Sequence, residues 1–264
     1  MPSARPLLVF DSGIGGLSVL RPIRALLPSA PIVYVADSAG YPYGTRRPGD
    51  IEARVPALLG RLSERFDPEL IVIACNTAST IALDGVRAAL DVPIVGTVPA
   101  IKPAAALTQT GAIGLLGTAA TVRQKYVDDL ERQFAQGKRL IRHACPELVA
   151  AAEAKLRGET PEPAVFAAAA SGLRNQPGGE AIDTVVLACT HFPLVEDELR
   201  AALGDNVMFV DGAQGIARRI AYLTQGQAFL RTSADVAVVT GGLARAGPLA
   251  AALKRYGLER IEAL

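Results

Sequence analysis

Short runs of apolar, largely β-branched residues recur along the chain, and segments with helical spacing of apolar residues lie between them. A continuous apolar run predicts a strand buried on both faces, as in a parallel sheet. Strands that alternate with helices predict an α/β fold with right-handed crossovers. In the first part of the chain the predicted strands are residues 7–10, 32–36, 70–74 and 94–97. Three helices are predicted there: one that ends near residue 27, one over residues 49–64 and one over residues 77–90.

The same alternation continues in a second series. Its predicted strands are residues 111–118, 139–143, 184–189, 208–210 and 236–240. Its predicted helices are residues 119–136, a segment through Glu153, residues 164–173, a segment from Asp211 and the end of the chain. Each half begins with a glycine-rich strand-turn-helix and contains a strand that ends in Ala-Cys. We therefore expect two pseudo-symmetric α/β domains with parallel sheets and an active site in the cleft between them.

The two Ala-Cys strands carry the candidate chemistry. Cys75 is followed by Asn76-Thr77, and Cys189 by Thr190-His191. A thiol at a strand-to-helix turn has a lowered pKa, because helix N-termini favour the thiolate. The short polar side chains and backbone amides around it suit a carboxylate ligand. The alternative is that each cysteine is a small buried hydrophobe; two in equivalent positions favour the functional interpretation.

Asp11-Ser12 follows the first predicted strand. The glycines after it do not fit G-x-G-x-x-G, because the last position is Ser18, so a dinucleotide fingerprint is missing. Asp11 and Ser12 can instead bind an ammonium group and orient a proton carrier, although Ser12 could also be a helix cap. Residues 41–46 fit a rigid substrate loop or an ordinary Pro/Gly surface turn.

His191 can tune Cys189 or act as an acid/base. A zinc site is an alternative that would recruit Cys75, Cys189 and His191, with Cys145 or His143. The chain has no C-x-x-C or H-x-x-x-H spacing to support it.

Composition narrows the function classes. The chain has 264 residues, half of them hydrophobic, and a net charge of +1, which gives no electrostatic footprint for nucleic acid or an anionic membrane. It has no apolar run long enough to span a membrane and no signal peptide, so we expect a cytoplasmic protein. Its three cysteines are an odd number and favour reduced thiols over a disulfide framework.

At this point the chain resembles the glutamate racemase family of bacterial cell-wall synthesis. The matching stretches occur in family order over almost the whole chain. They are Phe10–Ser18 (FDSGIGGLS), Pro42–Arg46 (PYGTR), Ala74–Ser79 (ACNTAS), Leu116–Thr118 (LGT), Cys145-Pro146 with Glu153, and Cys189–Leu194 (CTHFPL).

The resemblance implies a cofactor-independent, metal-free racemase that interconverts L- and D-glutamate. Cys75 and Cys189 would be the paired acid and base. Asp11 would assist Cys75, whereas Glu153 and His191 would assist Cys189. The implied substrate-binding residues are Asp11, Ser12, Pro42, Tyr43, Gly44, Cys75, Asn76, Thr77, Thr118, Thr121, Cys189, Thr190 and His191.

The resemblance also implies that the C-terminal segment completes the first domain. The expected domains are residues 1–97 with 207–264, and residues 98–206. We further expect a homodimer, and no regulation that depends on a long N-terminal extension. The alternatives are an aspartate racemase or related amino-acid isomerase on the same scaffold, a non-catalytic amino-acid-binding protein, and the zinc enzyme.

Overall fold

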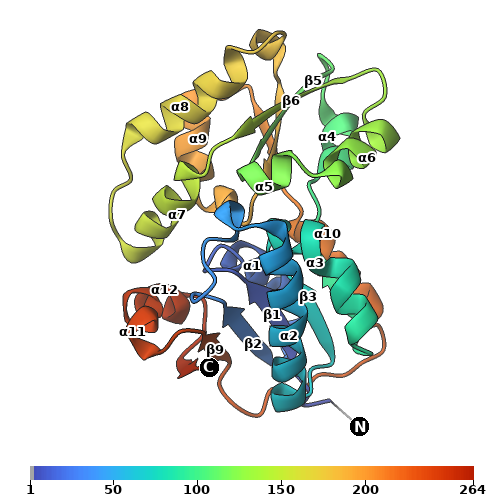
Figure 1. Cartoon of the computed structure of the whole chain (residues 1–264), viewed down its shortest axis with the longest axis vertical. Helices are drawn as coiled ribbons and strands as arrows, with labels where there is room; N and C mark the ends of the chain where they lie inside the picture. The colour runs from blue at the N-terminus through green and yellow to red at the C-terminus, as the bar shows by residue number, and fades with distance from the viewer. Residues whose placement is uncertain (1–2) are drawn as a thin grey trace. The chain divides into compact units, whose positions relative to one another are not determined.

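A computed structural model describes residues 3–264, and the chain divides into two compact units. The first unit runs to Thr97 and is completed by Ala213–Leu264; the second is Val98–Gly212. Each unit has its own parallel sheet with helices packed on it, which confirms the predicted α/β class (Figure 1). The C-terminal segment rejoins the first unit at Ala213 rather than at the expected residue 207, because residues 208–210 form a strand that pairs within the second unit.

The first unit is built on a parallel sheet of six strands. In chain order they are β1 (Leu7–Asp11), β2 (Ile32–Ala36), β3 (Leu70–Ile73), β4 (Ile94–Gly96), β9 (Val236–Val239) and β10 (Arg260–Ala263). Their order in the sheet is β10-β9-β2-β1-β3-β4. The C-terminal segment therefore extends the sheet from β2, whose Val33 is aligned with Val236.

Helices cover both faces of this sheet. They are α1 (Leu17–Leu26), α2 (Pro48–Phe66), α3 (Asn76–Ala89), α10 (Ala213–Leu223), α11 (Leu243–Ala246) and α12 (Ala250–Arg255), with 3-10 turns at Tyr43–Thr45 and Gly247–Leu249. Alternate strand residues such as Leu8 and Phe10 form one apolar cluster with Val55 of α2 and Ala82 of α3. On the opposite face Tyr34 donates a hydrogen bond to the Gly13 carbonyl just before α1, and α1 packs against α10.

The second unit has a parallel sheet of four strands. They are β5 (Ala112–Gly117), β6 (Arg139–Ala144), β7 (Thr184–Ala188) and β8 (Met208–Val210), in the order β6-β5-β7-β8. Its helices are α4 (Ile101–Leu107), α5 (Ala119–Val122), α6 (Lys125–Phe134), α7 (Glu147–Arg157), α8 (Pro163–Arg174) and α9 (Glu196–Leu203), with 3-10 turns at Gly179–Ala181 and Phe192–Val195.

Close packing on β5 explains one of its glycines. A Cβ at Gly114 would lie 3.0 Å from Leu173 Cδ1 of α8 and 3.1 Å from Val185 Cγ2 of β7. On the other face Ile113 and Leu115 join a cluster with α4 and α6. The central strand is therefore buried on both faces, as its continuous apolar run predicts.

Three elements differ from the sequence prediction. Residues 119–136 do not form one helix, because Gln124 is extended (φ −71°, ψ 134°) and separates α5 from α6. The short helix α4 and the edge strand β10 were not predicted. Both lack a strong signal: α4 is short, and β10 alternates polar and apolar residues at its exposed position.

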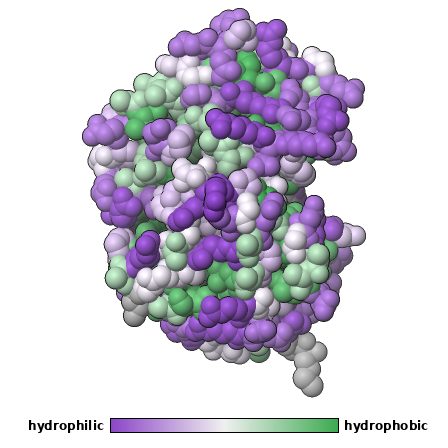
Figure 2. Space-filling model, in the orientation of Figure 1, coloured by the Kyte–Doolittle hydropathy of each residue, from purple (hydrophilic) through white to green (hydrophobic). Residues whose placement is uncertain are grey.

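Among the described residues, no helix is both long and apolar enough to cross a membrane. On the face shown in Figure 2, hydrophilic residues separate the hydrophobic ones into small areas.

Candidate active site

The strand order fixes where a ligand can bind in each unit. In the first sheet β1 lies between β2 and β3, so the chain steps to one side of β1 and then crosses to the other. In the second sheet β5 lies in the same way between β6 and β7. Open α/β sheets bind ligands at the carboxyl ends of the strands where the order reverses. Asp11 and Cys75 lie there in the first unit, and Thr118 and Cys189 in the second.

Cys75 is the N-cap residue of α3 and is 6% exposed. Its Sγ accepts a hydrogen bond from the Ala78 N–H at 3.4 Å, and its thiol donates to Ser12 Oγ at 3.7 Å. The first turn of a helix has free N–H groups, which stabilise a thiolate. Asn76 and Thr77 begin the same helix and are buried. The structure thus brings Ser12 to Cys75 and places a helix start beneath the sulfur.

Asp11 ends β1 and is fully buried. Its Oδ2 accepts hydrogen bonds from the N–H groups of Gly16, at 3.0 Å, and Gly13, at 3.4 Å. Its Oδ1 is buried and has no hydrogen-bond partner among the described residues. Buried carboxylate oxygens are costly to leave unpaired. This oxygen is therefore a strong acceptor for a donor supplied by a ligand.

The Tyr43 side chain is held by a buried carboxylate. Its hydroxyl donates to Asp37 Oδ2 at 2.5 Å, Thr240 donates to Asp37 Oδ1 at 2.5 Å, and Arg54 donates to both oxygens at 2.6 Å. Burial alone would raise the pKa of Asp37, but the hydrogen bonds from Arg54, Thr240 and Tyr43 hold this pKa below 3.8, the ordinary value for an aspartate. Burial, followed by the charge and hydrogen bond of Asp37, raises the pKa of Tyr43. Tyr43 is therefore a neutral phenol beside a carboxylate.

The loop that carries Tyr43 leaves little room for variation. Pro42 is the residue before the 3-10 turn, and Gly44 lies within that turn. A Cβ at Gly40 would lie 2.5 Å from Asp37 Oδ2 and 2.7 Å from Tyr43 Cε1. The loop therefore packs directly on the network around Asp37.

In the second unit, Cys189 belongs to a chain of three titratable side chains. Its Sγ lies 3.8 Å from His191 Nδ1, and His191 Nε2 lies 3.2 Å from Glu153 Oε1. Glu153 projects from α7, where Arg157 Nη1 lies 3.9 Å from its other oxygen. The structure thus brings Cys189, His191 and Glu153 together in one chain of contacts.

The electrostatics of His191 follow from these contacts. Burial alone would lower the pKa of His191, but the hydrogen bonds and charges of Cys189 and Glu153 raise this pKa well above 6.5, the ordinary value for histidine. An imidazolium held between a sulfur and a carboxylate stabilises negative charge on the sulfur and can return a proton to it.

Two threonines follow β5. Thr118 is the N-cap of α5 and accepts a hydrogen bond from the Thr121 N–H at 3.2 Å. The two hydroxyl oxygens lie 3.1 Å apart. Thr190 is buried between Cys189 and His191 in the sequence. These hydroxyls line the carboxyl edge of the sheet on which Cys189 lies.

The third cysteine has a different environment. Gly117 of β5 is aligned with Ala144 and with Ala188, so Cys145 and Cys189 follow strands on opposite sides of β5. Two strand spacings are about 9.5 Å, which is more than the Cα separation of a disulfide. Burial, then the charges of Cys189 and Glu147, raise the pKa of Cys145. Cys145 is therefore a protonated thiol, and none of the three cysteines forms a disulfide.

The geometry gives the zinc alternative no support. The His143 ring packs on α8, where a Cβ at Gly172 would lie 2.2 Å from His143 Nε2. Within residues 3–264, no cluster of three His, Cys, Asp or Glu side chains is arranged to hold a metal ion.

Sequence reasoning did not include Asp37, Arg54 and Thr240 in the site. Arg54 and Thr240 carry no local signal, because only the folded chain brings them to Asp37. Asp37 did have a local signal, because it directly follows a buried strand, just as Asp11 lies at the end of another buried strand.

The chain is similar to known proteins over most of its length. The family model described as Asp/Glu/Hydantoin racemase matches residues 17–220. A glutamate racemase of Sphingopyxis alaskensis is 64% identical over 97% of this chain and 96% of that protein. A glutamate racemase of Escherichia coli O157:H7 is 43% identical over 97% of this chain and 90% of that protein.

A solved structure agrees with the sequence relatives. The crystal structure of Escherichia coli glutamate racemase in complex with L-glutamate and the activator UDP-MurNAc-Ala superposes with a TM-score of 0.92, at 41% identity and over 98% of both chains. With a family match over most of its length and relatives of this similarity, the chain belongs to the Asp/Glu/Hydantoin racemase family.

Proposed function

We propose that this chain is a glutamate racemase that interconverts L- and D-glutamate without a cofactor, with Cys75 and Cys189 as the acid/base pair. The observation that carries the proposal is that each unit places one thiol at the reversal point of its sheet, with groups that can stabilise a thiolate or relay a proton. The full-length similarity to glutamate racemases supports glutamate as the substrate.

Racemisation explains why two thiols are needed. The enzyme must remove the Cα proton from one face of the substrate and return a proton to the other. A single base tends to return the proton to the face it left, whereas two groups on opposite faces do not. In one direction Cys75 is the thiolate and Cys189 the thiol, and in the other direction the roles exchange.

Proton transfer alone does not account for the rate. A positioned acid or base contributes about 10²–10⁴-fold, and the Cα proton of an amino acid is very weakly acidic. Donors around the substrate carboxylate must therefore stabilise the charge that develops as the proton leaves. We assign this role to Asn76, Thr77, Thr118, Thr121 and Thr190 with the helix amides beside them.

The remaining residues have matching roles in the proposal. The buried Oδ1 of Asp11, which has no donor within residues 3–264, accepts from the substrate ammonium group and orients the proton of Cys75. Ser12, Pro42, Tyr43 and Gly44 shape the substrate site in the first unit. His191 and Glu153 control the protonation of Cys189.

The second candidate is an aspartate racemase or related isomerase on the same scaffold. The thiols fit that reaction equally well, and the similarity to glutamate racemases favours glutamate. A non-catalytic amino-acid-binding protein would leave the relay from Cys189 to Glu153 without a purpose.

The cellular role belongs to the same proposal. Glutamate racemases of the family to which the sequence points supply D-glutamate for peptidoglycan, and hence for cell shape. We propose this role for the present chain, acting in the cytoplasm and as a homodimer.

The test is an assay of the purified chain with L-glutamate and, separately, L-aspartate, after extensive dialysis against a chelator. We expect D-glutamate to form without any added cofactor, and D-aspartate to form about 10–200-fold more slowly, because one missing methylene costs about 1–3 kcal/mol of discrimination. Faster racemisation of aspartate, or dependence on a dialysable cofactor, would overturn the proposal.

A further inference from the structure

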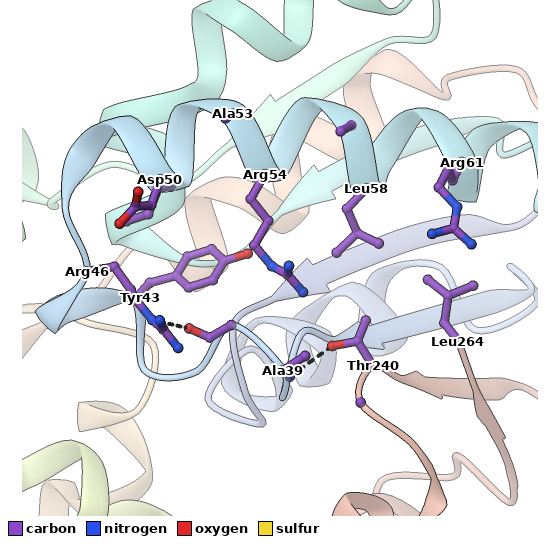
Figure 3. A pocket seen from close by; sticks show the side chains of 14 residues that line it. Ala39, Tyr43, Arg46, Asp50, Ala53, Arg54, Leu58, Arg61, Thr240 and Leu264 are labelled. Atoms are coloured by element: carbon purple, nitrogen blue, oxygen red, sulfur yellow. Dashed lines mark hydrogen bonds between the residues drawn. The ribbon is translucent and has the colours of Figure 1, made fainter.

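The first unit contains a pocket of about 670 Å³ that the proposed reaction does not use. It lies between α2 and the segments that follow β2 and β9 (Figure 3). Pockets of this size hold small molecules. Its lining includes Tyr43 but neither Cys75 nor Asp11, so its interior is separate from the thiol of the same unit.

One face of α2 forms a wall of the pocket. Arg54, Leu58 and Arg61 are spaced four and three residues apart, so they lie on one side of the helix. Figure 3 shows Arg54 directed toward Ala39 and Arg61 directed toward Leu264, with Leu58 between the two arginines. The wall therefore combines two guanidinium groups with an apolar side chain between them.

The pocket is rich in positive charge. Arg46, Arg54 and Arg61 line it together with a single carboxylate side chain, that of Asp50. Asp50 is held by Arg47, which donates two hydrogen bonds to it at 2.8 and 3.0 Å. Among the side chains that line the pocket, guanidinium groups therefore outnumber carboxylates.

Two of these arginines have guanidinium groups left to bind a ligand. Arg54 is committed to the buried carboxylate of Asp37. Among the described residues no carboxylate lies within ion-pair distance of Arg46 or Arg61, and Arg46 uses one N–H to donate to the Gly40 carbonyl. Arginine binds carboxylate and phosphate groups through paired N–H donors.

We propose that this pocket is a second ligand site, for a small organic molecule that carries carboxylate or phosphate groups on an apolar body. Arg46 and Arg61 bind the anionic groups, and Leu58, Ala57 and Leu264 contact the apolar part. The bound molecule lies against Tyr43, which also belongs to the substrate site in our proposal. The inference itself does not depend on the racemase reaction, because it rests on the pocket alone.

The experiment is a calorimetric titration of the whole chain with sodium pyrophosphate and, separately, with sodium citrate, at constant ionic strength. We expect saturable binding of at least one probe. Binding of pyrophosphate only would identify a phosphate ligand, and binding of citrate only a carboxylate ligand. Arg61→Ala should weaken binding about tenfold, because it removes a charge-assisted hydrogen bond. The matched control is Arg21→Ala, which removes an exposed arginine of α1 outside the pocket and should leave the affinity unchanged.

A second measurement locates the probe. In an amide NMR titration the bound probe should shift the signals of Ala57 and Gly241, which line the pocket on its two sides. The proposal is wrong if neither probe binds, if Arg61→Ala binds as tightly as the unmodified chain, or if Arg21→Ala loses as much affinity. It is also wrong if glutamate displaces the probe while the signals of Ala57 and Gly241 stay in place, because the probe would then occupy the substrate site.

Discussion

Cys75 and Cys189 occupy the same structural position but have different neighbours. Cys75 caps a helix and receives a backbone N–H, whereas Cys189 contacts an imidazole that is held by a carboxylate. The first sulfur is therefore stabilised as a thiolate by fixed dipoles and the second by a titratable partner. This difference allows the two thiols to be tested one at a time.

The thiols should be separable with 3-chloroglutamate, from which removal of the Cα proton expels chloride. Each of Cys75→Ser and Cys189→Ser keeps one thiol and hence access to one face of the substrate. We expect each variant to release chloride from one enantiomer only, and from opposite enantiomers, as measured by chloride release. Cys145→Ser is the control and should act on both. Equal loss toward both enantiomers in either variant would contradict the assignment.

The coupling between His191 and Glu153 predicts a dependence on pH. The pKa of His191 is raised in the folded chain above 6.5, the ordinary value for histidine. The stabilisation from this pair is therefore complete below pH 6.5 and is lost as the pH rises through the raised pKa. Glu153→Gln removes one cause of the increase. We expect its His191 signal to titrate at lower pH in an NMR titration, and the gap in unfolding free energy between the two proteins to shrink as the pH rises.

The chain has two histidines, so the NMR spectrum gives an internal control. His143 packs on α8 at Gly172, and no hydrogen bond or ion pair joins it to Glu153 among the described residues. A Glu153→Gln variant in which the His191 signal titrates at the same pH as in the unmodified chain would show that the carboxylate does not control this imidazole.

At the scale of the elements, the predicted positions of both candidate thiols depended on buried strands that end in Ala-Cys. Such strands are recognisable because a parallel strand is apolar on both faces. The break between α5 and α6 was not recognisable, because the extended conformation of Gln124 follows from how the chain packs. Nor could strand pairing be read from the pattern: the placement of β9 beside β2 depends on contacts between distant residues.

A single hydroxyl joins three of these elements. Ser79 of α3 donates to the Ile73 carbonyl of β3 at 2.9 Å and accepts from the Thr97 N–H after β4 at 3.0 Å. The Thr97 N–H also donates directly to the Ile73 carbonyl at 3.2 Å, so neither backbone group loses its last partner in Ser79→Ala. The substitution removes two hydrogen bonds, each worth about 0.5–1.5 kcal/mol, so we expect it to lower the free energy of unfolding by about 1–3 kcal/mol. Chemical denaturation measures this loss.

Ser63→Ala is the matched control for that experiment. The hydroxyl of Ser63 on α2 is buried without a hydrogen-bond partner among the described residues. Its removal should be neutral or slightly stabilising, because no hydrogen bond is lost. If the two variants lose the same stability, hydrogen bonding by Ser79 does not hold the start of α3 in place.

At the scale of the whole molecule, the two units repeat one layout. In each, a central strand ends in polar residues, a neighbouring strand ends in Ala-Cys, and a third strand lies on the other side. The sheet of the first unit is complete only with the strands of the C-terminal segment. Just before β9, Asp235 accepts hydrogen bonds from the Ile32 N–H and from Arg231. The repeat was visible in the sequence as a pattern of strands. The return of the C-terminal segment was implied by the family resemblance and not by that pattern, because a lone aspartate carries no sign of its distant partners.

The central claim is that both units contribute a thiol to one reaction. Its most direct test is to let the enzyme convert a few per cent of L-glutamate in D₂O and to measure deuterium at Cα in each enantiomer separately. Two exchangeable acid/base groups on opposite faces predict deuterium in the D-glutamate formed and protium in the L-glutamate recovered, and the mirror result from D-glutamate. Deuterium that enters the recovered substrate as fast as the product would show one base serving both faces, and would contradict the account.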